Sequence, residues 1–374
     1  MYSFRTFAKF IARAIFGCFS KCRYDSSKII SIPNADVFFG YFGRDIVCNN
    51  KILATVVADK STNLSVINID TGKVAKSFPV RTTNLQQANQ QQWFDENTFG
   101  FLDLDSCNNF STKIVNNDDI AINIPLALQT KINETSFIAI DYSSFEKFAP
   151  DYSYNNGKSS VSGVHIVTFN LGAATYETAR QFDSRCVKRF LKLNNPKRFH
   201  LNHFLVSPGM NFIVFVARYY KKGKRVDKLL MWSLSKAEFT ICLDTDYVSH
   251  FCFISKSELL IFGRPNVNDK RCYFVLNINK SVTSTYFPAK DLKVDGHPVS
   301  HKNMVITDTY PNIYNYQKLI VLEEKESREF IFFHPNILDP ARRCDLHPVY
   351  DNLSNTVFVN HFHENRRVIG CVNV

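Results

Sequence analysis

The chain lacks a compact cysteine framework, a long helical period and a nucleic-acid-binding motif, and each absence excludes a class of protein. Its 10 cysteines are scattered singly, apart from Cys18 and Cys22, and most lie in apolar, strand-like runs. Such thiols are typical of a reduced cytosolic protein and not of a disulfide scaffold. The net charge of +11 favours an anionic partner: nucleic acid, anionic lipid and acidic polysaccharide all qualify by charge alone. The one dense basic run, Lys221 to Arg225, is interpreted as a solvated hairpin tip.

The N-terminal segment has the pattern of a basic amphipathic helix. The apolar run from Phe4 to Phe19 is interrupted by Arg5, Lys9 and Arg13, so it lacks the apolar centre of a signal peptide and is too charged to span a bilayer. We expect residues 1–28 to contain this helix, with residues 4–22 either contacting an anionic membrane surface or docking on protein. The predicted location is therefore the cytoplasm, with peripheral contact at the inner membrane as one option.

Residues 29–374 have the sequence pattern of a single all-β domain. Short apolar runs alternate with Asn, Asp, Gly and Lys turns, and aromatic residues make up 14% of the chain, which favours strands. Residues 65–73, 165–172 and 231–236 repeat one strand pattern. A repeat of roughly 40 to 50 residues predicts a β-propeller of about seven blades. Within it, Thr178 to Leu193 is the segment most compatible with a helix.

Histidine is absent from the first 164 residues and then recurs at expected strand ends in short polar motifs. Histidine titrates near neutrality and is the commonest metal ligand, so its delivery by successive segments predicts a catalytic pocket, a metal site or both. The motifs are Asn202-His203, Ser249-His250, Asp295-Gly296-His297-Pro298, Arg343-Cys344-Asp345-Leu346-His347-Pro348 and His361-Phe362-His363-Glu364.

The motifs divide into two groups. His203 with Arg218 and His250 suits proton abstraction next to a carboxylate, since the arginine stabilises negative charge while a histidine takes the proton. Buried histidines with structural partners are the alternative. The second group is a tetrahedral N/S metal site, either structural or catalytic, for which Asp295, Asp308 and Asp345 are candidates to accept hydrogen bonds from the ligating rings. Its expected ligands are His297, Cys344, His347 and His363.

Two further segments carry polar candidates. The stretch Gln86 to Trp93 is either a polar loop or a set of amides for a hydroxyl-rich ligand, with Trp93 stacking or anchoring. Tyr41, which lies between Gly40 and Gly43, is a candidate acid or sugar platform, or a packing residue.

In their order along the chain, these motifs resemble a β-propeller family related to oligogalacturonate lyases and ulvan lyases. The resemblance runs through residues 38–44, 84–93, 202–218, 249–250, 295–298, 308–311, 343–348 and 363–367. It implies a seven-bladed propeller of a bacterial polysaccharide locus. Such a protein acts on or binds a uronic-acid-containing glycan by β-elimination, and has no nucleic-acid partner.

The resemblance also implies roles for single residues. His203 would be the base, Arg218 the charge neutraliser, and His250 or Tyr41 the acid. Zinc or manganese would lie on His297, Cys344, His347 and His363. The expected substrate contacts are Arg44, Asn84, Gln86, Gln87, Gln92, Trp93 and Asn202.

The chain departs from the family pattern at several polar positions. Gly43 and Arg44 take the places of an aspartate and a lysine, and Asn360 the place of an aspartate. Thr83, Ala88 and Ala217 replace a tryptophan, a glycine and a histidine. A scaffold that has lost such groups predicts, as the alternative, a non-catalytic glycan-binding or assembly protein of capsule or lipopolysaccharide synthesis.

Overall fold

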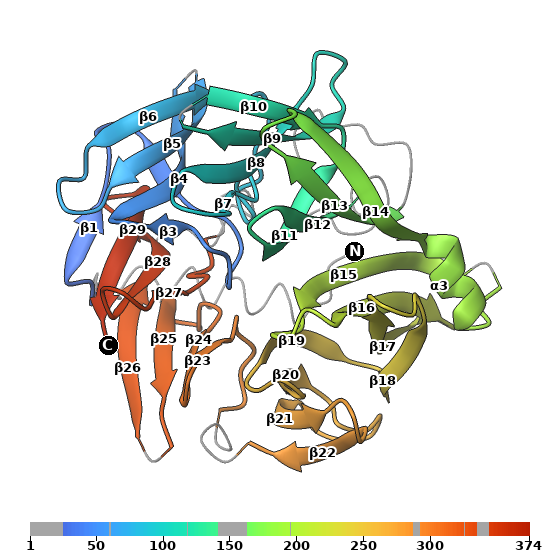
Figure 1. Cartoon of the computed structure of the whole chain (residues 1–374). Helices are drawn as coiled ribbons and strands as arrows, with labels where there is room; N and C mark the ends of the chain where they lie inside the picture. Colours follow the sequence, from blue (N-terminus) through green and yellow to red (C-terminus); the bar gives the residue numbers. More distant parts are fainter. Residues whose placement is uncertain are drawn as a thin grey trace.

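The computed structural model describes residues 25–59, 61–117, 119–140, 163–194, 196–286, 292–324, 326–334 and 344–374. The predicted N-terminal helix over residues 4–22 and Arg343 of the last histidine motif lie outside the described residues. Seven antiparallel sheets surround a central axis, as Figure 1 shows. The prediction of an all-β, seven-bladed propeller is therefore confirmed.

Blades 1 to 3 follow the chain in order. Blade 1 is formed by β2 (Asp36–Phe38), β4 (Lys51–Ala58), β5 (Ser61–Asn68) and β6 (Val74–Pro79), with β3 (Val47–Cys48) paired to β4. Blade 2 is formed by β7 (Gln92–Trp93), β8 (Thr98–Leu104), β9 (Phe110–Asn116) and β10 (Asp119–Ile124). Blade 3 is formed by β11 (Ala127–Asn133), β12 (Ser136–Ile140), β13 (Gly163–Asn170) and β14 (Thr175–Asp183).

Blades 4 to 6 continue the ring. Blade 4 is formed by β15 (Lys197–Val206), β16 (Phe212–Lys221), β17 (Lys224–Ser233) and β18 (Phe239–Thr245). Blade 5 is formed by β19 (Val248–Phe253), β20 (Glu258–Gly263), β21 (Cys272–Asn277) and β22 (Val282–Thr285). Blade 6 is formed by β23 (Val299–His301), β24 (Met304–Asp308), β25 (Tyr316–Leu322) and β26 (Ser327–Phe333).

The seventh blade joins the two ends of the domain. It combines β27 (Val349–Asp351), β28 (Thr356–His363) and β29 (Arg366–Asn373) with β1 (Lys28–Ile30) from the start of the domain. β1 pairs antiparallel with β29, with Lys28 opposite Cys371 and Ile30 opposite Ile369. This pairing closes the ring, because the outer edge strand of the last blade comes from the opposite end of the chain.

A helix follows β14, although it is shorter than the sequence suggested. α3 (Ser184–Phe190) begins at its N-cap Asp183, whose carboxylate accepts a hydrogen bond from the backbone N–H of Cys186. The preceding residues, from Thr178 onward, belong to β14. Among the residues that the structure describes, no helix is both long enough and apolar enough to cross a bilayer.

The core lies between neighbouring blades, which pack face to face. β8 is buried along its whole length, so both of its faces are covered and its sequence is mostly apolar without strict alternation. One cluster joins Ile306 and Leu319 of blade 6 to Val357 and Val372 of blade 7. The first strand of each blade lies nearest the central channel, as Figure 1 shows. Polar side chains on these strands therefore face a common space.

Candidate active site in the central channel

Blades 4 to 7 each contribute one histidine to a single cluster. His203 lies in β15, His250 in β19, His297 just before β23 and His347 just before β27. The ring centroids of His203 and His250 are 4.8 Å apart, those of His250 and His297 4.3 Å, and those of His297 and His347 4.4 Å. The two histidine groups of the sequence analysis are therefore neighbours in one continuous arc.

Irregular pairing positions the first two histidines. The register of β15 against β16 shifts between Asn202 and Leu205, and that of β19 against β20 shifts between Val248 and Phe251. A bulge adds a residue to one strand and redirects the side chains beside it. Both shifts contain the histidine of their blade, so the irregular pairing fixes where each ring lies.

Backbone strain accompanies this placement. His203 has a φ of 54° and His347 a φ of 47°. A non-glycine residue in this left-handed region costs about 1–3 kcal/mol and persists only where the surroundings impose it. At His203, the side-chain oxygen of Asn202 accepts the backbone N–H at 2.9 Å. Asn202, a predicted substrate contact, thus supports the conformation of the neighbouring histidine.

Tyr41 of blade 1 completes the cluster. Its hydroxyl lies 3.3 Å from Nδ1 of His203 and 3.0 Å from Nε2 of His250. The same ring contacts His347 edge-on, with 5.0 Å between centroids. The loop that carries Tyr41 passes very close to blade 2, because a Cβ atom at Gly40 would lie 2.7 Å from the backbone oxygen of Gln87. Glycine at this position therefore allows Tyr41 to reach the histidines.

Asp295 orients the first of these histidines. Nδ1 of His250 is 3.1 Å from one carboxylate oxygen of Asp295, and the other oxygen accepts the hydroxyl of Ser249. Burial opposes ionisation of Asp295, but the neighbouring His250 and Ser249 outweigh it and the pKa of Asp295 is lowered. An ionised carboxylate only accepts, so Nδ1 of His250 donates to it and Nε2 faces the Tyr41 hydroxyl. The same hydroxyl lies within hydrogen-bonding distance of Nδ1 of His203.

His203 ends this chain as a neutral ring. Burial, and after it the nearby His250 and Arg218, hold the pKa of His203 well below its usual range. At neutral pH the ring is therefore uncharged, so one of its nitrogens donates and the other accepts. We call the four residues Asp295, His250, Tyr41 and His203 the tyrosine relay.

A second buried carboxylate orients the other two histidines. Asp308, 1% exposed, lies 2.9 Å from Nδ1 of His297 and accepts the backbone N–H of His297 at 2.7 Å and of His347 at 3.1 Å. Burial raises the pKa of Asp308 even though His347 and these hydrogen bonds act in the opposite direction. A Cβ atom at Gly296 would overlap the backbone oxygen of Asp308, so this approach requires glycine.

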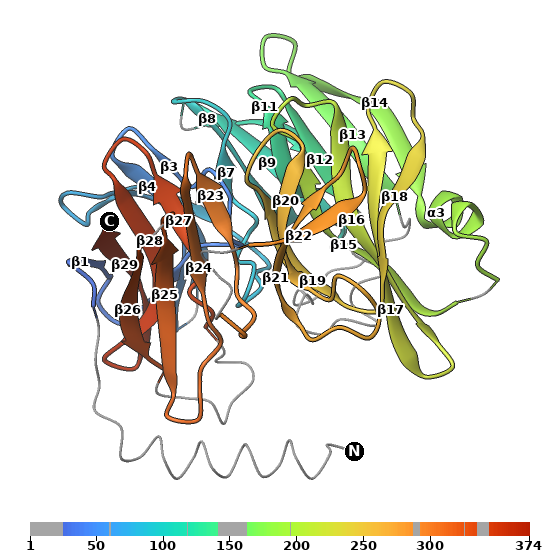
Figure 2. The ribbon, with the colours of Figure 1, turned by 90° about the horizontal axis from the view of Figure 1, so that it is seen from below.

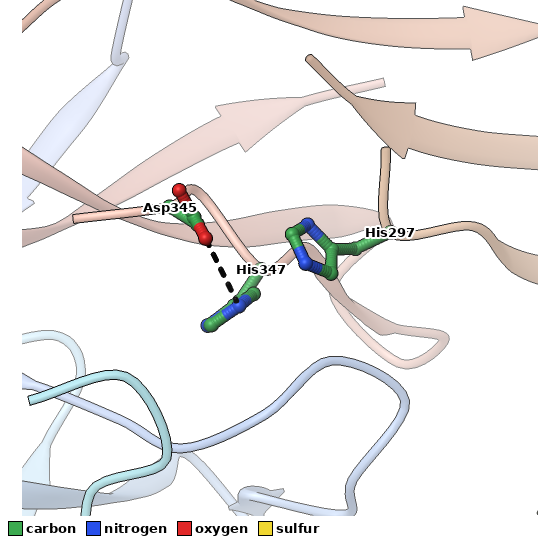
Figure 3. A group of neighbouring side chains, drawn as sticks. All are labelled: His297, Asp345 and His347. Atoms are coloured by element: carbon green, nitrogen blue, oxygen red, sulfur yellow. Dashed lines mark ion pairs between the residues drawn. The ribbon is translucent and has the colours of Figure 1, made fainter. Parts of the chain in front are cut away.

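Three side chains beside Asp308 form a candidate metal site. The ligand atoms offered by His297, Asp345 and His347 all lie within 4.8 Å of one another, and all three residues are buried. Figure 3 shows them converging, with the carboxylate of Asp345 4.0 Å from Nε2 of His347. Two imidazole nitrogens and one carboxylate oxygen suit zinc or manganese. Asp308 hydrogen-bonds the imidazole of His297, as a carboxylate commonly does for a histidine that binds a metal ion. The residues therefore fit a metal ion.

Two predicted ligands lie outside this group. The Cys344 thiol is buried, and burial raises its pKa to about 12, so the thiolate that binds metal is disfavoured. His363, at the end of β28, is partly exposed and lies 3.9 Å from the carboxylate of Glu364. The third place in the group is taken by Asp345. Asp345 and His347 both lie in the segment that precedes β27.

Arg218 is held by a buried carboxylate. Its Nε lies 2.8 Å from Asp227, which is fully buried, and its Nη2 donates to the backbone oxygen of Val248 at 2.8 Å. Arg225 binds the same carboxylate at 2.6 Å. Burial opposes ionisation of Asp227, but the two guanidinium groups prevail and its pKa is lowered. Arg218 therefore joins blades 4 and 5, and its predicted role in neutralising a substrate stays a prediction.

Arg44 and Gln87 line a small pocket next to the relay. Arg44 is buried and donates to the backbone oxygen of Gln129 in blade 3. The pocket has a volume of about 30 Å³, the space of one or two water molecules. It is lined by Tyr41, Phe42, Gly43, Arg44, Gln87, Gln129, Thr130, Asn202, His203, Phe204, Leu205 and Phe251.

The other amides of the glutamine-rich stretch are used within the protein. Asn84 accepts the backbone N–H groups of Gln86 and Gln87 at 2.7 and 2.8 Å and so fixes the loop. Gln92 is buried and accepts the backbone N–H of Lys131 at 2.8 Å. Trp93 is buried against Phe99 and donates to the backbone oxygen of Ile46 at 3.1 Å. Of the predicted substrate contacts in this stretch, only Gln87 lines the pocket beside the relay.

The fold and the channel together define a seven-bladed β-propeller with a polar, histidine-lined centre. No family model matches the chain, and no curated protein matches it. Solved structures do match it in fold. An oligogalacturonate lyase from Vibrio parahaemolyticus is 14% identical with a TM-score of 0.60, and the match covers 95% of this chain and 96% of that one. An oligogalacturonate lyase in complex with manganese is 11% identical with a TM-score of 0.61, over the same shares of the two chains.

A propeller of different function matches almost as well. The β-propeller domain of the Trilobed protease from Pyrococcus furiosus is 9% identical with a TM-score of 0.55, covering 89% of this chain and 93% of that one. Identities this low establish the propeller architecture and leave the function to be argued from the site itself.

Proposed function

We propose that the protein is a cytoplasmic, lyase-like propeller that binds a uronic-acid-containing glycan in its channel and cleaves it by β-elimination. The observation that supports this most is the tyrosine relay. β-Elimination needs a base that removes the proton next to the uronate carboxylate and an acid that protonates the leaving O4. A tyrosine hydroxyl hydrogen-bonded to two imidazoles supplies both groups within a few ångströms.

Each residue of the relay has a role in this proposal. Neutral His203, whose Nδ1 donates to Tyr41, takes the proton on Nε2. The C4–O4 bond breaks as the C4–C5 double bond forms, and Tyr41 protonates the departing oxygen. His203, which now carries a proton on each nitrogen, then passes its Nδ1 proton to Tyr41 and is neutral again, while His250, oriented by Asp295, holds the Tyr41 hydroxyl in place. The pocket that His203, Tyr41 and Arg44 share places a guanidinium beside the reacting groups.

The metal group complements the relay. A divalent ion bound by His297, Asp345 and His347 would supply positive charge beside the substrate carboxylate, which acidifies the neighbouring C–H bond. Asp308 holds the imidazole of His297 and the backbone N–H of His347 in place. His297 also contacts His250 of the relay through its ring, so the two halves of the site adjoin.

A non-catalytic glycan-binding or assembly role in capsule or lipopolysaccharide synthesis is the second candidate. It is favoured by the commitment of Arg218 to Asp227 and of Gln92 to the backbone of Lys131, which leaves fewer polar groups for a substrate.

Incubation with uronic-acid polysaccharides, monitored by the ultraviolet absorbance of unsaturated uronates, tests the proposal. Wild-type protein should generate product, and Tyr41→Phe should lower kcat by about 10²–10⁴-fold. Tyr310→Phe is the matched control, because Tyr310 contacts the ring of His297 and lies outside the relay. If wild-type protein yields no product but binds the polysaccharide, the lyase proposal fails and the binding role replaces it.

A further inference from the structure

A strongly basic surface lies on blades 4 and 5, beside the channel. It is built from the turn of the β16–β17 hairpin, the residue Tyr247 between β18 and β19, and the loop between β20 and β21. Figure 2 shows the β16–β17 hairpin projecting from the face drawn at the bottom. We call this surface the basic rim. Its cations are Lys221, Lys222, Lys224, Arg225, Lys270 and Arg271.

Most of these cations have no acidic partner. Arg225 shares the carboxylate of Asp227 with Arg218, so two guanidinium groups face one negative charge. The loop carboxylate Asp269 accepts hydrogen bonds from Asn266 within its own loop. The remaining five rim cations are exposed, and none forms an ion pair with a carboxylate of the described residues. The rim therefore carries a surplus of positive charge.

Tyr247 brings two arginines together. The guanidinium carbons of Arg225 and Arg271 lie 4.3 and 3.8 Å from the centroid of its ring. Each contact is favourable, but two like charges held at one ring repel each other, and a nearby anion relieves that repulsion. Arg225 already uses its Nε and Nη2 on Asp227 and the backbone oxygen of Val248, which leaves the guanidinium of Arg271 to present paired N–H donors. Such paired donors match the two oxygens of a carboxylate, so the rim suits a carboxylate-bearing ligand.

The rim is continuous with the channel. Arg225 and Arg218 both donate to the backbone oxygen of Val248, at 2.7 and 2.8 Å. The backbone N–H of Val248 in turn donates to Asp227 at 2.8 Å. His250 of the tyrosine relay lies two residues further along β19. A linear polyanion with one residue at the relay therefore has its neighbouring residues within reach of the rim.

We infer that the basic rim binds the flanking residues of an acidic polysaccharide whose reacting residue lies at the tyrosine relay. This inference rests on the proposed function and deepens it, because it assigns a long chain and not a short oligosaccharide as the preferred ligand. A carboxylate-bearing glycan is favoured over a single-stranded nucleic acid, since two guanidinium groups already lie against the aromatic ring of the rim, on which a base would have to stack.

Binding of polygalacturonate and of trigalacturonate, measured over a range of salt concentrations, tests the inference. The triple variant Lys221→Glu, Lys222→Glu, Lys224→Glu should weaken polygalacturonate binding about tenfold or more and flatten its salt dependence. Trigalacturonate binding should stay unchanged. The charge-matched control, Lys51→Glu, Lys73→Glu, Lys76→Glu in exposed positions of blade 1, should leave both affinities nearly unchanged.

Two outcomes would overturn the inference. One is an equal loss in the rim triple and the control triple, which would mean that net charge alone attracts the chain. The other is tighter binding of single-stranded RNA or of anionic vesicles than of polygalacturonate at equal ionic strength. Failure of the proposed function is distinguishable from failure of this inference. In that case Tyr41→Phe would behave like wild-type protein, while polymer binding would still depend on the rim.

Discussion

The two sides of the channel use polar residues in opposite ways. Blades 1 and 2 contribute amides whose hydrogen bonds end within the protein, such as Asn89, which bonds Thr55 and the backbone of Thr82 and Leu102. Blades 4 to 7 contribute histidines whose rings touch one another and whose orientation is set by Asp295 and Asp308. Amides do not titrate in the physiological range, whereas imidazoles do. The amides of blades 1 and 2 therefore serve as scaffold, whereas Tyr41 of blade 1 and the histidines of blades 4 to 7 are the groups that can exchange protons.

Strain is present on both sides, so strain alone does not mark function. Ala88 and Gln90 on the amide side have φ values of 47° and 52°, close to the 54° of His203 and the 47° of His347. The difference lies in what the strained residue holds. Ala88 pairs with Asn84 to close a loop, whereas His203 reaches the hydroxyl of Tyr41.

The largest effect is expected at the carboxylate that orients the histidine side. Asp308→Ala removes the acceptor for the ring of His297 and for two backbone N–H groups, all buried. The free energy of unfolding at pH 7 should fall by about 3–5 kcal/mol in denaturant titrations. Asp351→Ala, in the exposed β27–β28 turn, is the control and should cost no more than about 1 kcal/mol. A loss below 1 kcal/mol at Asp308 would contradict the account.

Metal affinity should separate the ligands from their neighbours. His347→Ala removes one of the three ligand atoms that lie within 4.8 Å, so calorimetric titration with zinc or manganese should show a loss of about 100-fold or more. His363→Ala should leave the affinity unchanged, because His363 lies outside that group. Equal losses of metal affinity in the two variants would support the four-ligand site that the sequence predicted.

A buried histidine outside the cluster should make the fold acid-sensitive. His361 donates to the backbone oxygen of Phe362, accepts from Ser26, and is 1% exposed. Burial lowers its pKa to about 4 from 6.5, so the unfolded chain binds more protons between these values and stability falls as pH falls below 6.5. The loss from pH 7 to pH 5 should be about 2 kcal/mol.

His361→Gln should remove that share of the acid sensitivity. The measure is the difference in slope between variant and wild type, since His203 has a lowered pKa of the same sign. Identical slopes in denaturant titrations from pH 5 to pH 7 would contradict the assignment.

The smallest effect is expected on the amide side. Gln92→Ala removes the acceptor for the backbone N–H of Lys131 and should lower the free energy of unfolding by about 1–3 kcal/mol. It should leave metal affinity unchanged, because the metal group consists of His297, Asp345 and His347. A loss of metal affinity in this variant would break the distinction between the two sides.

The propeller was predictable because strand length and turn composition are local properties. The convergence of the histidines was predictable only in part, since which rings touch depends on how blades rotate about the axis. The salt bridge of Arg218 could have been predicted from the sequence. The tip Lys222-Gly223 sets a hairpin register in which Arg218 lies directly opposite Asp227, a pairing that favours a salt bridge over a free guanidinium.

Other features depend on contacts that no local pattern encodes. Asn360, where the resembling family has an aspartate, accepts the backbone N–H of Phe39 at 2.9 Å and donates to its oxygen at 3.1 Å. An aspartate could not donate, so the amide suits the join between blade 7 and the loop of Tyr41. The N-terminal helix and its membrane contact stay predictions.

The titration of His203 tests most directly whether the histidines form one unit. In spectra of ring-labelled histidine, His203 of wild-type protein should titrate well below 6.5, because of burial and then of His250, Arg218 and His297 nearby. His297→Gln should raise the pKa of His203, whereas His361→Gln, outside the cluster, should leave it unchanged. If His203 titrates near 6.5 in wild-type protein, or does not respond to the loss of His297, the single histidine cluster at the centre of this account is contradicted.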